Sequence, residues 1–303
     1  MKDKTKVRIT LLTGLALLSA TGLFLNYSSA EMSRHSIINS PTASTSPSPT
    51  VSATPTPPTK SLPSNFSQTC GFTLVNIKPA QRIKDCTVLV VGDSMASNLG
   101  WGLSNILGKT SGINLILKGK SSTGLANSWF YDWTKELPPI LVENKPDVVI
   151  IFIGANDYQS ERINGVVEPF AGKAWLENYT HQIAALEAEA NAAGAFVVWV
   201  ELPIMRPPGY AIGINELTKI QEKVVVANRE AIYLNIRPVI SSFTGNYSEN
   251  AIVNGRLEKI RGDDGIHFSS IGQRALATFV IEKLNQIFHV DIPLSVKYLI
   301  PRQ

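Results

Sequence analysis

Two residue types that proteins use to build metal sites are scarce in this sequence. Its 303 residues include only two cysteines, Cys70 and Cys86, and four histidines. Neither cysteine has a histidine or a second cysteine at the spacing of zinc ligands, so we expect no metal site. The sequence also lacks a G-x-G-x-x-G motif and a P-loop, the glycine-rich patterns that bind dinucleotides and nucleotide phosphates. We therefore expect no cofactor.

A large excess of charge is also missing. The formal net charge is +4, and Lys2, Lys4, Lys6 and Arg8, less Asp3, account for +3 of it. The remainder of the chain is nearly neutral, so we expect no nucleic-acid partner. Apolar residues make up 44% of the sequence, which is enough to build a buried core.

The N-terminal segment has the composition of a targeting sequence. Behind its positive residues the chain runs without a charge from Ile9 to Leu25, and small residues follow at Ser28-Ser29-Ala30. The length suits both a short membrane span and a long signal-peptide core. We expect residues 1–30 to be either a membrane anchor or a cleaved signal peptide. In both cases the rest of the chain is extracytoplasmic, periplasmic or at the cell surface, because the positive end stays inside.

The next segment has almost no large apolar residues. Residues 31–65 contain a Pro/Ser/Thr-rich stretch that cannot bury enough surface to fold and that its prolines keep extended. We expect a disordered linker here and one folded domain over residues 66–303. In an oxidising compartment Cys70 and Cys86 favour a disulfide, and the alternative is two free buried thiols.

From Thr87 onward, short β-branched runs alternate with helical patterns. Runs that are apolar throughout are typical of strands buried on both faces of a parallel sheet. We predict a three-layer α/β/α domain with a mostly parallel five-stranded sheet. The predicted strands cover residues 87–91, 113–117, 147–153, 195–202 and 231–236, and the predicted helices cover 95–107, 175–193, 216–230 and 269–288.

Polar motifs lie at the ends of these elements. Gly92-Asp93-Ser94 follows the first strand, Gly154-Ala155-Asn156-Asp157 follows the third, and Asp264-Gly265-Ile266-His267 precedes the last helix. Open α/β sheets bind ligands at the carboxyl ends of their strands. We therefore expect these motifs to meet at one edge of the sheet.

One histidine is placed to act as a base. A serine nucleophile needs a base, and a histidine base needs a third group that orients it. His35 lies in the linker, His181 in the middle of a predicted helix and His289 at the end of the last one. His267 alone lies in a polar loop with a carboxylate, Asp264, three residues earlier. By itself this pair is also compatible with a helix cap or a surface contact.

The order of the three motifs resembles that of the GDSL/SGNH hydrolases, a superfamily of esterases, lipases, thioesterases and carbohydrate deacetylases. The resemblance covers roughly Thr87–Phe288 and is greatest to a less-characterised bacterial extracytoplasmic branch. It implies a flavodoxin-like sheet and a catalytic triad. Ser94 would be the nucleophile, His267 the base and Asp264 the acid that orients it. Met95 stands where the family name leads one to expect leucine and is a similar apolar filler.

The resemblance also implies an oxyanion hole, which needs donors where negative charge develops. The donors would be the Ser94 N–H, the Asn156 side-chain amide and the N–H of a glycine after the second strand. Gly124 is our choice because it follows a Ser/Thr cluster, and Gly119 is the alternative. Ser94 is also compatible with a helix N-cap, and Asn156 with a turn residue.

Three further side chains are candidates for binding substrate. Trp129 and Tyr131 follow the second strand, and Arg206 lies in a Pro-rich stretch after the fourth that we expect to be a rigid loop. The alternatives are packing under a loop for the aromatic residues and plain solvent exposure for Arg206.

The predicted location suggests a substrate class. An extracytoplasmic hydrolase meets cell-wall and extracellular glycans first. We expect an ester hydrolase that acts on an acylated small molecule or glycan, removing O-acetyl or other small acyl groups. The alternatives are an O-acyltransferase that uses the same acyl-enzyme and a catalytically inactive glycan-binding module. The membrane would be a partner if the N-terminal helix is uncleaved.

Overall fold

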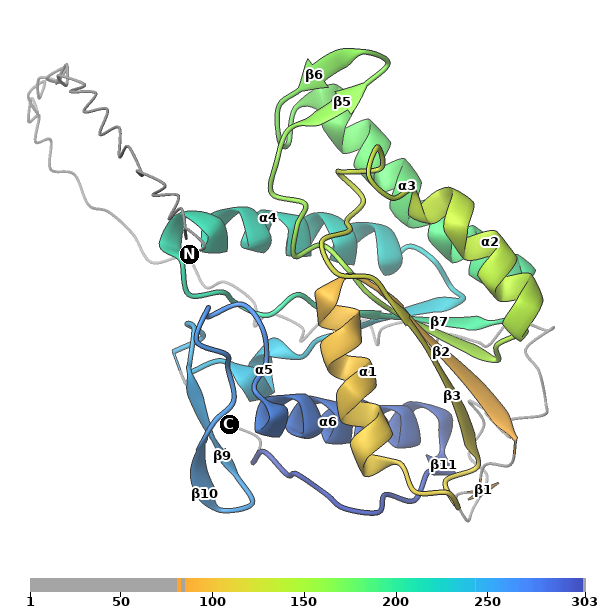
Figure 1. Cartoon of the computed structure of the whole chain (residues 1–303), viewed down its shortest axis with the longest axis vertical. Coiled ribbons are helices and arrows are strands. Elements are labelled where there is room, and N and C mark those ends of the chain that lie inside the picture. Colours follow the sequence, from red (N-terminus) through yellow and green to blue (C-terminus); the bar gives the residue numbers. More distant parts are fainter. Residues whose placement is uncertain (1–80, 83–84, 243, 302–303) are drawn as a thin grey trace, which may run out of the picture. The chain divides into compact units, whose positions relative to one another are not determined.

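The computed structural model describes residues 81–82, 85–242 and 244–301. Five strands form one sheet in the spatial order β3-β2-β4-β7-β8, and every neighbouring pair is parallel (Figure 1). Counted among these five strands alone, the order is 2-1-3-4-5, which is the flavodoxin-like order. The predicted fold class is thus confirmed. The strands are β2 (Cys86–Gly92), β3 (Ile113–Gly119), β4 (Val148–Phe152), β7 (Phe196–Val200) and β8 (Ala231–Leu234).

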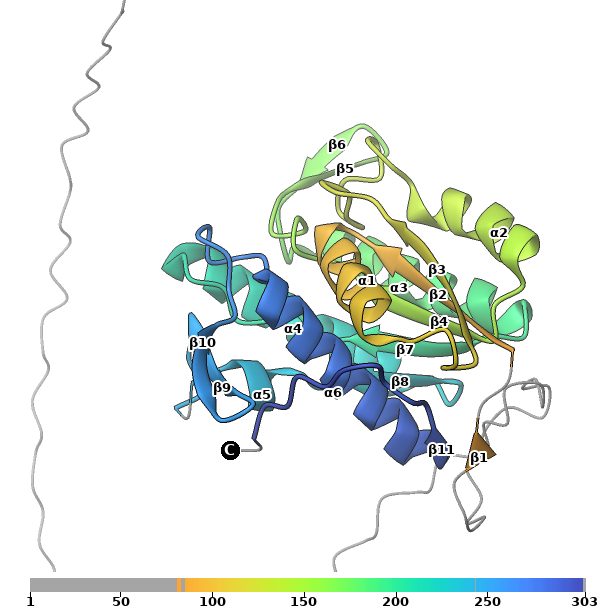
Figure 2. The same ribbon diagram turned by 60° about the horizontal axis from the view of Figure 1, so that its bottom comes forward.

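Helices cover both faces of the sheet (Figures 1 and 2). One layer contains α1 (Ser94–Ile106) and α6 (Ser270–Phe288), which pack against each other. In the opposite layer α3 packs against both α2 and α4. Right-handed crossovers explain this division, because the chain moves one way along the sheet from β2 to β3 and the other way at each later step. The bounds of the second layer are α2 (Trp133–Asn144), α3 (Lys173–Ala192) and α4 (Pro208–Val225).

The position of each strand explains its sequence. All residues of β4 and β7 are buried, because these strands lie inside the sheet with helices on both faces. The edge strand β3 has no fully buried residue and carries Asn114 and Lys118 among its apolar residues. The continuous apolar runs therefore mark the strands at the centre of the core.

Two helices differ from the prediction. Helix α2 was not predicted, and it contains Pro138 and Pro139, residues that normally interrupt a helix. Its buried residues are Trp133, Leu137 and Leu141, an apolar stripe with the spacing of one helix face. Helix α4 begins at Pro208 and not near residue 216, so part of the predicted rigid loop is helical. Proline suits the first helical position because its φ is already helical.

Two hairpins outside the main sheet were also missed. β5 (Glu161–Ile163) pairs with β6 (Val166–Glu168), and β9 (Asn250–Val253) pairs with β10 (Arg256–Lys259). Each hairpin turns through an Asn-Gly pair, at residues 164–165 and 254–255, in which both residues have positive φ. Asn-Gly is a strong local signal for such a turn.

Short elements complete the described structure. α5 (Arg237–Ile240) follows β8, and β1 (Gln81–Arg82) pairs with β11 (Val290–Asp291). The predicted targeting segment, the linker and Cys70 lie outside the described residues, while Cys86 is disulfide-bonded. No helix in the described part of the chain is long and apolar enough to span a membrane.

Candidate active site

The motifs that follow β2, β3 and β4 meet at one edge of the sheet (Figure 1). Past the ends of the strands, the Lys120 N–H donates to the Gly92 carbonyl at 2.8 Å. The Asp93 N–H donates to the Phe152 carbonyl at 3.3 Å. Gly92 has a φ of 134°, and an added Cβ would lie 2.1 Å from the Phe152 carbonyl oxygen. Only glycine fits this turn, which leads directly into Ser94.

Ser94, His267 and Asp264 form a continuous hydrogen-bonded chain. His267 Nε2 lies 2.7 Å from Ser94 Oγ, and His267 Nδ1 lies 2.6 Å from Asp264 Oδ2. The N-cap of α1 is Asp93, whose carboxylate accepts from the Met95 N–H. The Ser94 hydroxyl is therefore not used to cap the helix, and its partner is the imidazole.

Asp264 is held as an anion. Its Oδ1 accepts from the backbone N–H of Ile266 at 2.8 Å and of His267 at 2.9 Å. Partial burial pushes the pKa of Asp264 up, but the hydrogen bonds from the His267 imidazole and from these two N–H groups outweigh it and lower the pKa to about 2. An ionised Asp264 fixes the imidazole orientation and favours its positive form.

Two side chains that the sequence analysis did not identify hold the loop that carries His267. The guanidinium of Arg261, which is 1% exposed, donates to the Ile266 carbonyl at 2.7 Å and to the Ile204 carbonyl at 2.8 Å. Asn98 Oδ1 on α1 accepts from the Phe268 N–H at 2.9 Å. The contacts of Arg261 with Ile204 and of Asn98 with Phe268 join segments far apart in the chain, so no local motif in the sequence points to them.

Asn156 faces the segment that follows β3. Its Nδ2 donates to the Thr123 carbonyl at 2.8 Å, which fixes the orientation of the side-chain amide. Thr123 is itself fixed, because its hydroxyl donates to the Lys120 carbonyl and accepts from Trp133 Nε1. An amide nitrogen carries two hydrogens, so Asn156 retains a second N–H for another acceptor.

The proposed third donor, Gly124, packs against a carboxylate. An added Cβ would lie 1.9 Å from Asp157 Oδ1. The Gly124 N–H shares a peptide unit with the Thr123 carbonyl, and these two groups point in opposite directions. Because the carbonyl faces Asn156, the Gly124 N–H points away from the Asn156 amide. The alternative, Gly119, ends β3 and lies against α1, where an added Cβ would be 2.6 Å from Ser97 Oγ.

Residues 87–283 match the family described as protein of unknown function (DUF459). The chain belongs to the DUF459 family. Its arrangement of motifs and fold resembles the GDSL/SGNH hydrolases, as the sequence analysis predicted. No curated protein matches it significantly.

Several solved structures are similar to the chain. A GDSL-like lipase from Bacteroides thetaiotaomicron is 16% identical, with 67% of this chain and 89% of that chain covered and a TM-score of 0.46. A psychrotrophic esterase from a Pseudoalteromonas species is 18% identical, with 67% and 98% covered and a TM-score of 0.44. An acetylxylan esterase from Geobacillus stearothermophilus is 15% identical, with 73% and 100% covered and a TM-score of 0.47.

The predicted substrate-binding residues of the DUF459 chain differ in their surroundings. Trp129 is 80% exposed and lies edge-on to Phe130, with ring centroids 6.0 Å apart. Tyr131 is half-buried and packs edge-on against the buried Trp133. Arg206 is exposed, and its side chain donates to the Asp263 carbonyl beside the loop that carries His267. The structure thus leaves Trp129 and Arg206 accessible, whereas Tyr131 is partly used in packing.

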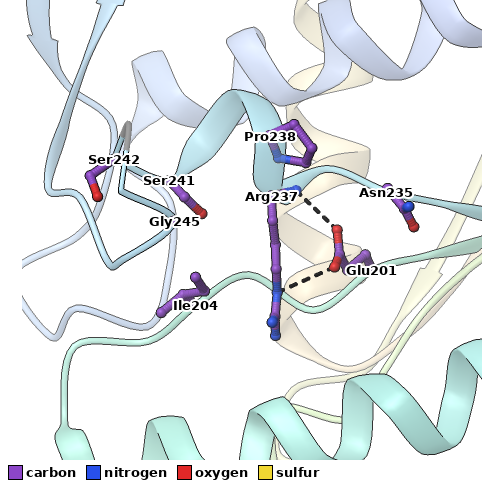
Figure 3. Close-up of a pocket in the computed structure, with 8 residues that line it drawn as sticks. All are labelled: Glu201, Ile204, Asn235, Arg237, Pro238, Ser241, Ser242 and Gly245. Atoms are coloured by element: carbon purple, nitrogen blue, oxygen red, sulfur yellow. Dashed lines mark hydrogen bonds and ion pairs between the residues drawn. The ribbon is translucent and has the colours of Figure 1, made fainter. Parts of the chain in front are cut away.

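A cavity of about 450 Å³ lies at the carboxyl ends of β7 and β8, and its lining includes none of the predicted site residues (Figure 3). Its two charged residues, Glu201 and Arg237, are ion-paired with each other. Arg237 also donates to Leu202, Asn215 and Thr218. Because these charges are already satisfied within the protein, we assign the cavity no part in the chemistry. In the described residues no group of three His, Cys, Asp or Glu is placed to hold a metal ion.

Proposed function

We propose that this chain is a serine ester hydrolase that works through an acyl-enzyme on Ser94. The observation that carries the proposal is the hydrogen-bonded chain Ser94–His267–Asp264. Its two contacts have the length expected of a nucleophile with its base and of a base with its orienting acid.

The reaction follows from this geometry. Ser94 Oγ attacks the ester carbonyl carbon, and its proton passes to His267 Nε2. The tetrahedral intermediate collapses when the imidazolium gives that proton to the departing alcohol. Water then attacks the acyl-enzyme, with His267 again as base, and releases the acid and Ser94. Asp264 stays ionised throughout and stabilises the imidazolium.

The negative oxygen of each intermediate needs donors. Two are the Ser94 N–H, at the N-terminus of α1, and the second N–H of Asn156. For the third, we favour the N–H of Ser122 over that of Gly124. Ser122 lies between two residues that are hydrogen-bonded to the other parts of the site. The Lys120 N–H donates to the Gly92 carbonyl in the turn before Ser94, and the Thr123 carbonyl accepts from the Asn156 amide. The φ of Ser122 is 63°, a conformation that is uncommon for a residue other than glycine and that is concentrated at functional sites.

The substrate we propose is a small acyl ester on a glycan outside the cytoplasm. The side chains of His267 and Asp264 are 38% and 46% exposed. A site this open suits a small acyl group on an extended polymer better than a long acyl chain, which needs a deep apolar pocket. The exposed ring of Trp129 is available to stack on a sugar, and Arg206 to contact a polar group. Free access of water also favours hydrolysis over acyl transfer, which needs water excluded.

A series of p-nitrophenyl esters of increasing acyl length tests the proposal, using the full-length protein and Ser94→Ala. We expect turnover of the acetate, declining with longer chains, and its loss in the variant. Release of acetate from an acetylated polysaccharide, compared with the same polysaccharide after deacetylation, then tests whether a glycan is the substrate. Turnover that survives in Ser94→Ala would refute the nucleophile. Acyl transfer to an added sugar without hydrolysis would support the transferase alternative, and no reaction at all would support a binding module.

A further inference from the structure

Two carboxylates of the polar motifs, those of Asp93 and Asp157, take no part in the reaction described above. Asp93 and Asp157 are both fully buried, at 0% exposure, and neither forms an ion pair among the described residues. A buried carboxylate without a cation is costly unless several donors surround it. What donates to them therefore indicates what they do.

Asp93 joins the turn of the nucleophile to the turn of Asn156. Its Oδ1 accepts from the Met95 N–H at 2.7 Å. Its Oδ2 accepts from the Gly154 N–H at 2.9 Å and from the Ala155 N–H at 2.8 Å. One carboxylate thus binds the residue after Ser94 and the two residues before Asn156.

Asp157 joins the Asn156 turn to the segment after β3. Its Oδ1 accepts from the Ala126 N–H at 3.1 Å, and the Leu125 N–H also donates to the carboxylate. Its Oδ2 accepts from the Tyr179 hydroxyl at 2.9 Å, and that hydroxyl accepts in turn from Gln221 Nε2 at 3.0 Å. The segment held in this way contains Thr123, whose carbonyl fixes the Asn156 amide.

We propose that Asp93 and Asp157 are positioning residues that fix the oxyanion donors relative to one another. Through them the turn of Ser94, the turn of Asn156 and the segment after β3 form one braced unit. The inference rests on the proposed function and deepens it. It assigns the two aspartates a role in stabilising the transition state, although neither contacts the substrate.

Both oxygens of each carboxyl group accept hydrogen bonds from these donors, whereas an asparagine has only one acceptor oxygen. At position 93 the NH₂ group of an asparagine would face at least one backbone N–H. At position 157 it would replace the oxygen that accepts from the Tyr179 hydroxyl or the one that accepts from the Ala126 N–H. Burial raises the pKa of Asp93 to about 7, and the nearby charge of Asp157 adds to the rise. The hydrogen bonds from the N–H groups of Met95, Ala155 and Gly154 lower this pKa but do not outweigh the burial. Burial raises the pKa of Asp157 to about 6, against the donors from Ala126, Leu125 and Tyr179.

The role predicts a specific kinetic effect. Oxyanion donors act on the transition state and contribute little to substrate binding, so displacing them lowers kcat and leaves KM nearly unchanged. Loss of one oxyanion donor typically costs about 10²–10³ in kcat. We expect Asp93→Asn and Asp157→Asn each to lower kcat by about 10²-fold, with KM within about threefold.

The matched control is Glu201→Gln. Glu201 is also a buried carboxylate, at 8% exposure, and accepts from the backbone N–H of Ile236 and Arg237. It lies in the cavity wall outside the active site (Figure 3). The Glu201→Gln variant tests the general effect of removing a buried carboxylate that accepts hydrogen bonds from backbone N–H groups. We expect its kcat to stay within about threefold of the wild type when both are assayed well below their melting temperatures.

The experiment uses the full-length protein, p-nitrophenyl acetate and a fluorophosphonate, which forms a tetrahedral adduct with an active serine. We expect the two aspartate variants to react with the fluorophosphonate about 10²-fold more slowly than the wild type and Glu201→Gln. Equal rates in folded aspartate variants would overturn the inference while leaving the proposed function intact. A wild-type protein that neither hydrolyses ester nor labels at Ser94 would instead overturn the proposed function.

Tyr179→Phe keeps the test decisive if an aspartate variant does not fold. It removes one neutral donor to Asp157 Oδ2 and leaves the carboxylate in place. We expect a smaller loss of kcat, about threefold to tenfold, with KM unchanged. An unchanged kcat in this folded variant would count against the brace.

Discussion

The imidazole of His267 is hydrogen-bonded on both ring nitrogens, and this defines the roles of its two neighbours. Nε2 faces the Ser94 hydroxyl, and Nδ1 faces the Asp264 carboxylate. Residues that act as one unit are not additive when removed. The individual variants and their combinations therefore report whether these three side chains share one function.

We predict that Ser94→Ala and His267→Ala each lower kcat for p-nitrophenyl acetate by about 10³-fold or more. The double variant should be no worse than the poorer single variant, because the second change removes a group that has already lost its role. Steady-state kinetics on the three proteins measure this. Losses that multiply would show that the two residues act independently.

Asp264→Asn should lower kcat by roughly 10²–10⁴, since an asparagine favours the wrong imidazole tautomer. KM should change little. Because the pKa of Asp264 is lowered to about 2, the wild-type carboxylate stays ionised between pH 4 and pH 8. A fall in wild-type kcat/KM within that range must therefore arise from another group. The pH profiles of both proteins check this, and an activity step that vanishes only in Asp264→Asn would contradict it.

Ser122 tests the proposed third oxyanion donor. Ser122→Gly keeps the backbone N–H and tolerates a φ of 63°, so we expect kcat within about threefold of the wild type. Ser122→Val disfavours that φ and should displace the N–H, with a loss of kcat of about tenfold or more and a smaller effect on KM. Equal kcat values in the two variants would refute the assignment.

At the scale of elements, the packing of α1 on α6 leaves no room at Gly102. An added Cβ there would lie 2.2 Å from the Gln273 carbonyl oxygen. We expect Gly102→Ala to lower the free energy of unfolding by about 1–3 kcal/mol, because the helices must move apart. The control is Gly209→Ala in α4, where an added Cβ meets no atom within 4 Å and the change should not destabilise. Urea unfolding measures both, and equal effects would contradict the packing argument.

The elements that the sequence predicted well are those with continuous apolar runs or long amphipathic patterns. The central strands and α6 lie close to their predicted bounds, because burial on one or two faces dictates their residue types. Helix α2 was missed since two prolines outweighed its apolar stripe. The two small hairpins were missed although each contains an Asn-Gly turn, because their strands are short and mostly exposed.

The residues of the candidate site divide in the same way, into those that lie in local sequence motifs and those that depend on the packing of distant segments. The predictions for Ser94 and Asn156 rest on compact motifs at strand ends, and those for Asp264 and His267 on a compact motif before α6. Arg261 and Asn98 were not predicted, since the contact of Arg261 with Ile204 and that of Asn98 with Phe268 depend on how distant segments meet in three dimensions. The direction of the Gly124 N–H depends on the orientation of a single peptide unit, which no sequence pattern specifies.

At the scale of the whole molecule, the buried aspartates make stability depend on pH. The folded pKa of Asp93 is about 7, against an ordinary value of 3.8, so between these values the folded state binds more protons than the unfolded state. Its contribution to the free energy of unfolding is therefore lost as the pH rises from about 4 to about 7. Asp157 acts in the same direction, up to about pH 6.

We expect Asp93→Asn to remove part of this dependence. Urea unfolding of the full-length protein at several pH values between 4 and 8 measures the free energy of unfolding. Relative to Asp93→Asn, the wild type should lose stability as the pH rises toward 7. Curves that stay parallel across this range would contradict the assignment of a raised pKa to Asp93.

The central claim is that Ser94 forms a covalent intermediate, and the most direct measurement is peptide mapping by mass spectrometry after reaction with a fluorophosphonate. Our account predicts one phosphonyl group per chain, on the peptide that contains Ser94, and none in Ser94→Ala or in protein unfolded before labelling. A label on another serine of the folded protein, or no label under conditions in which the ester is hydrolysed, would contradict the account.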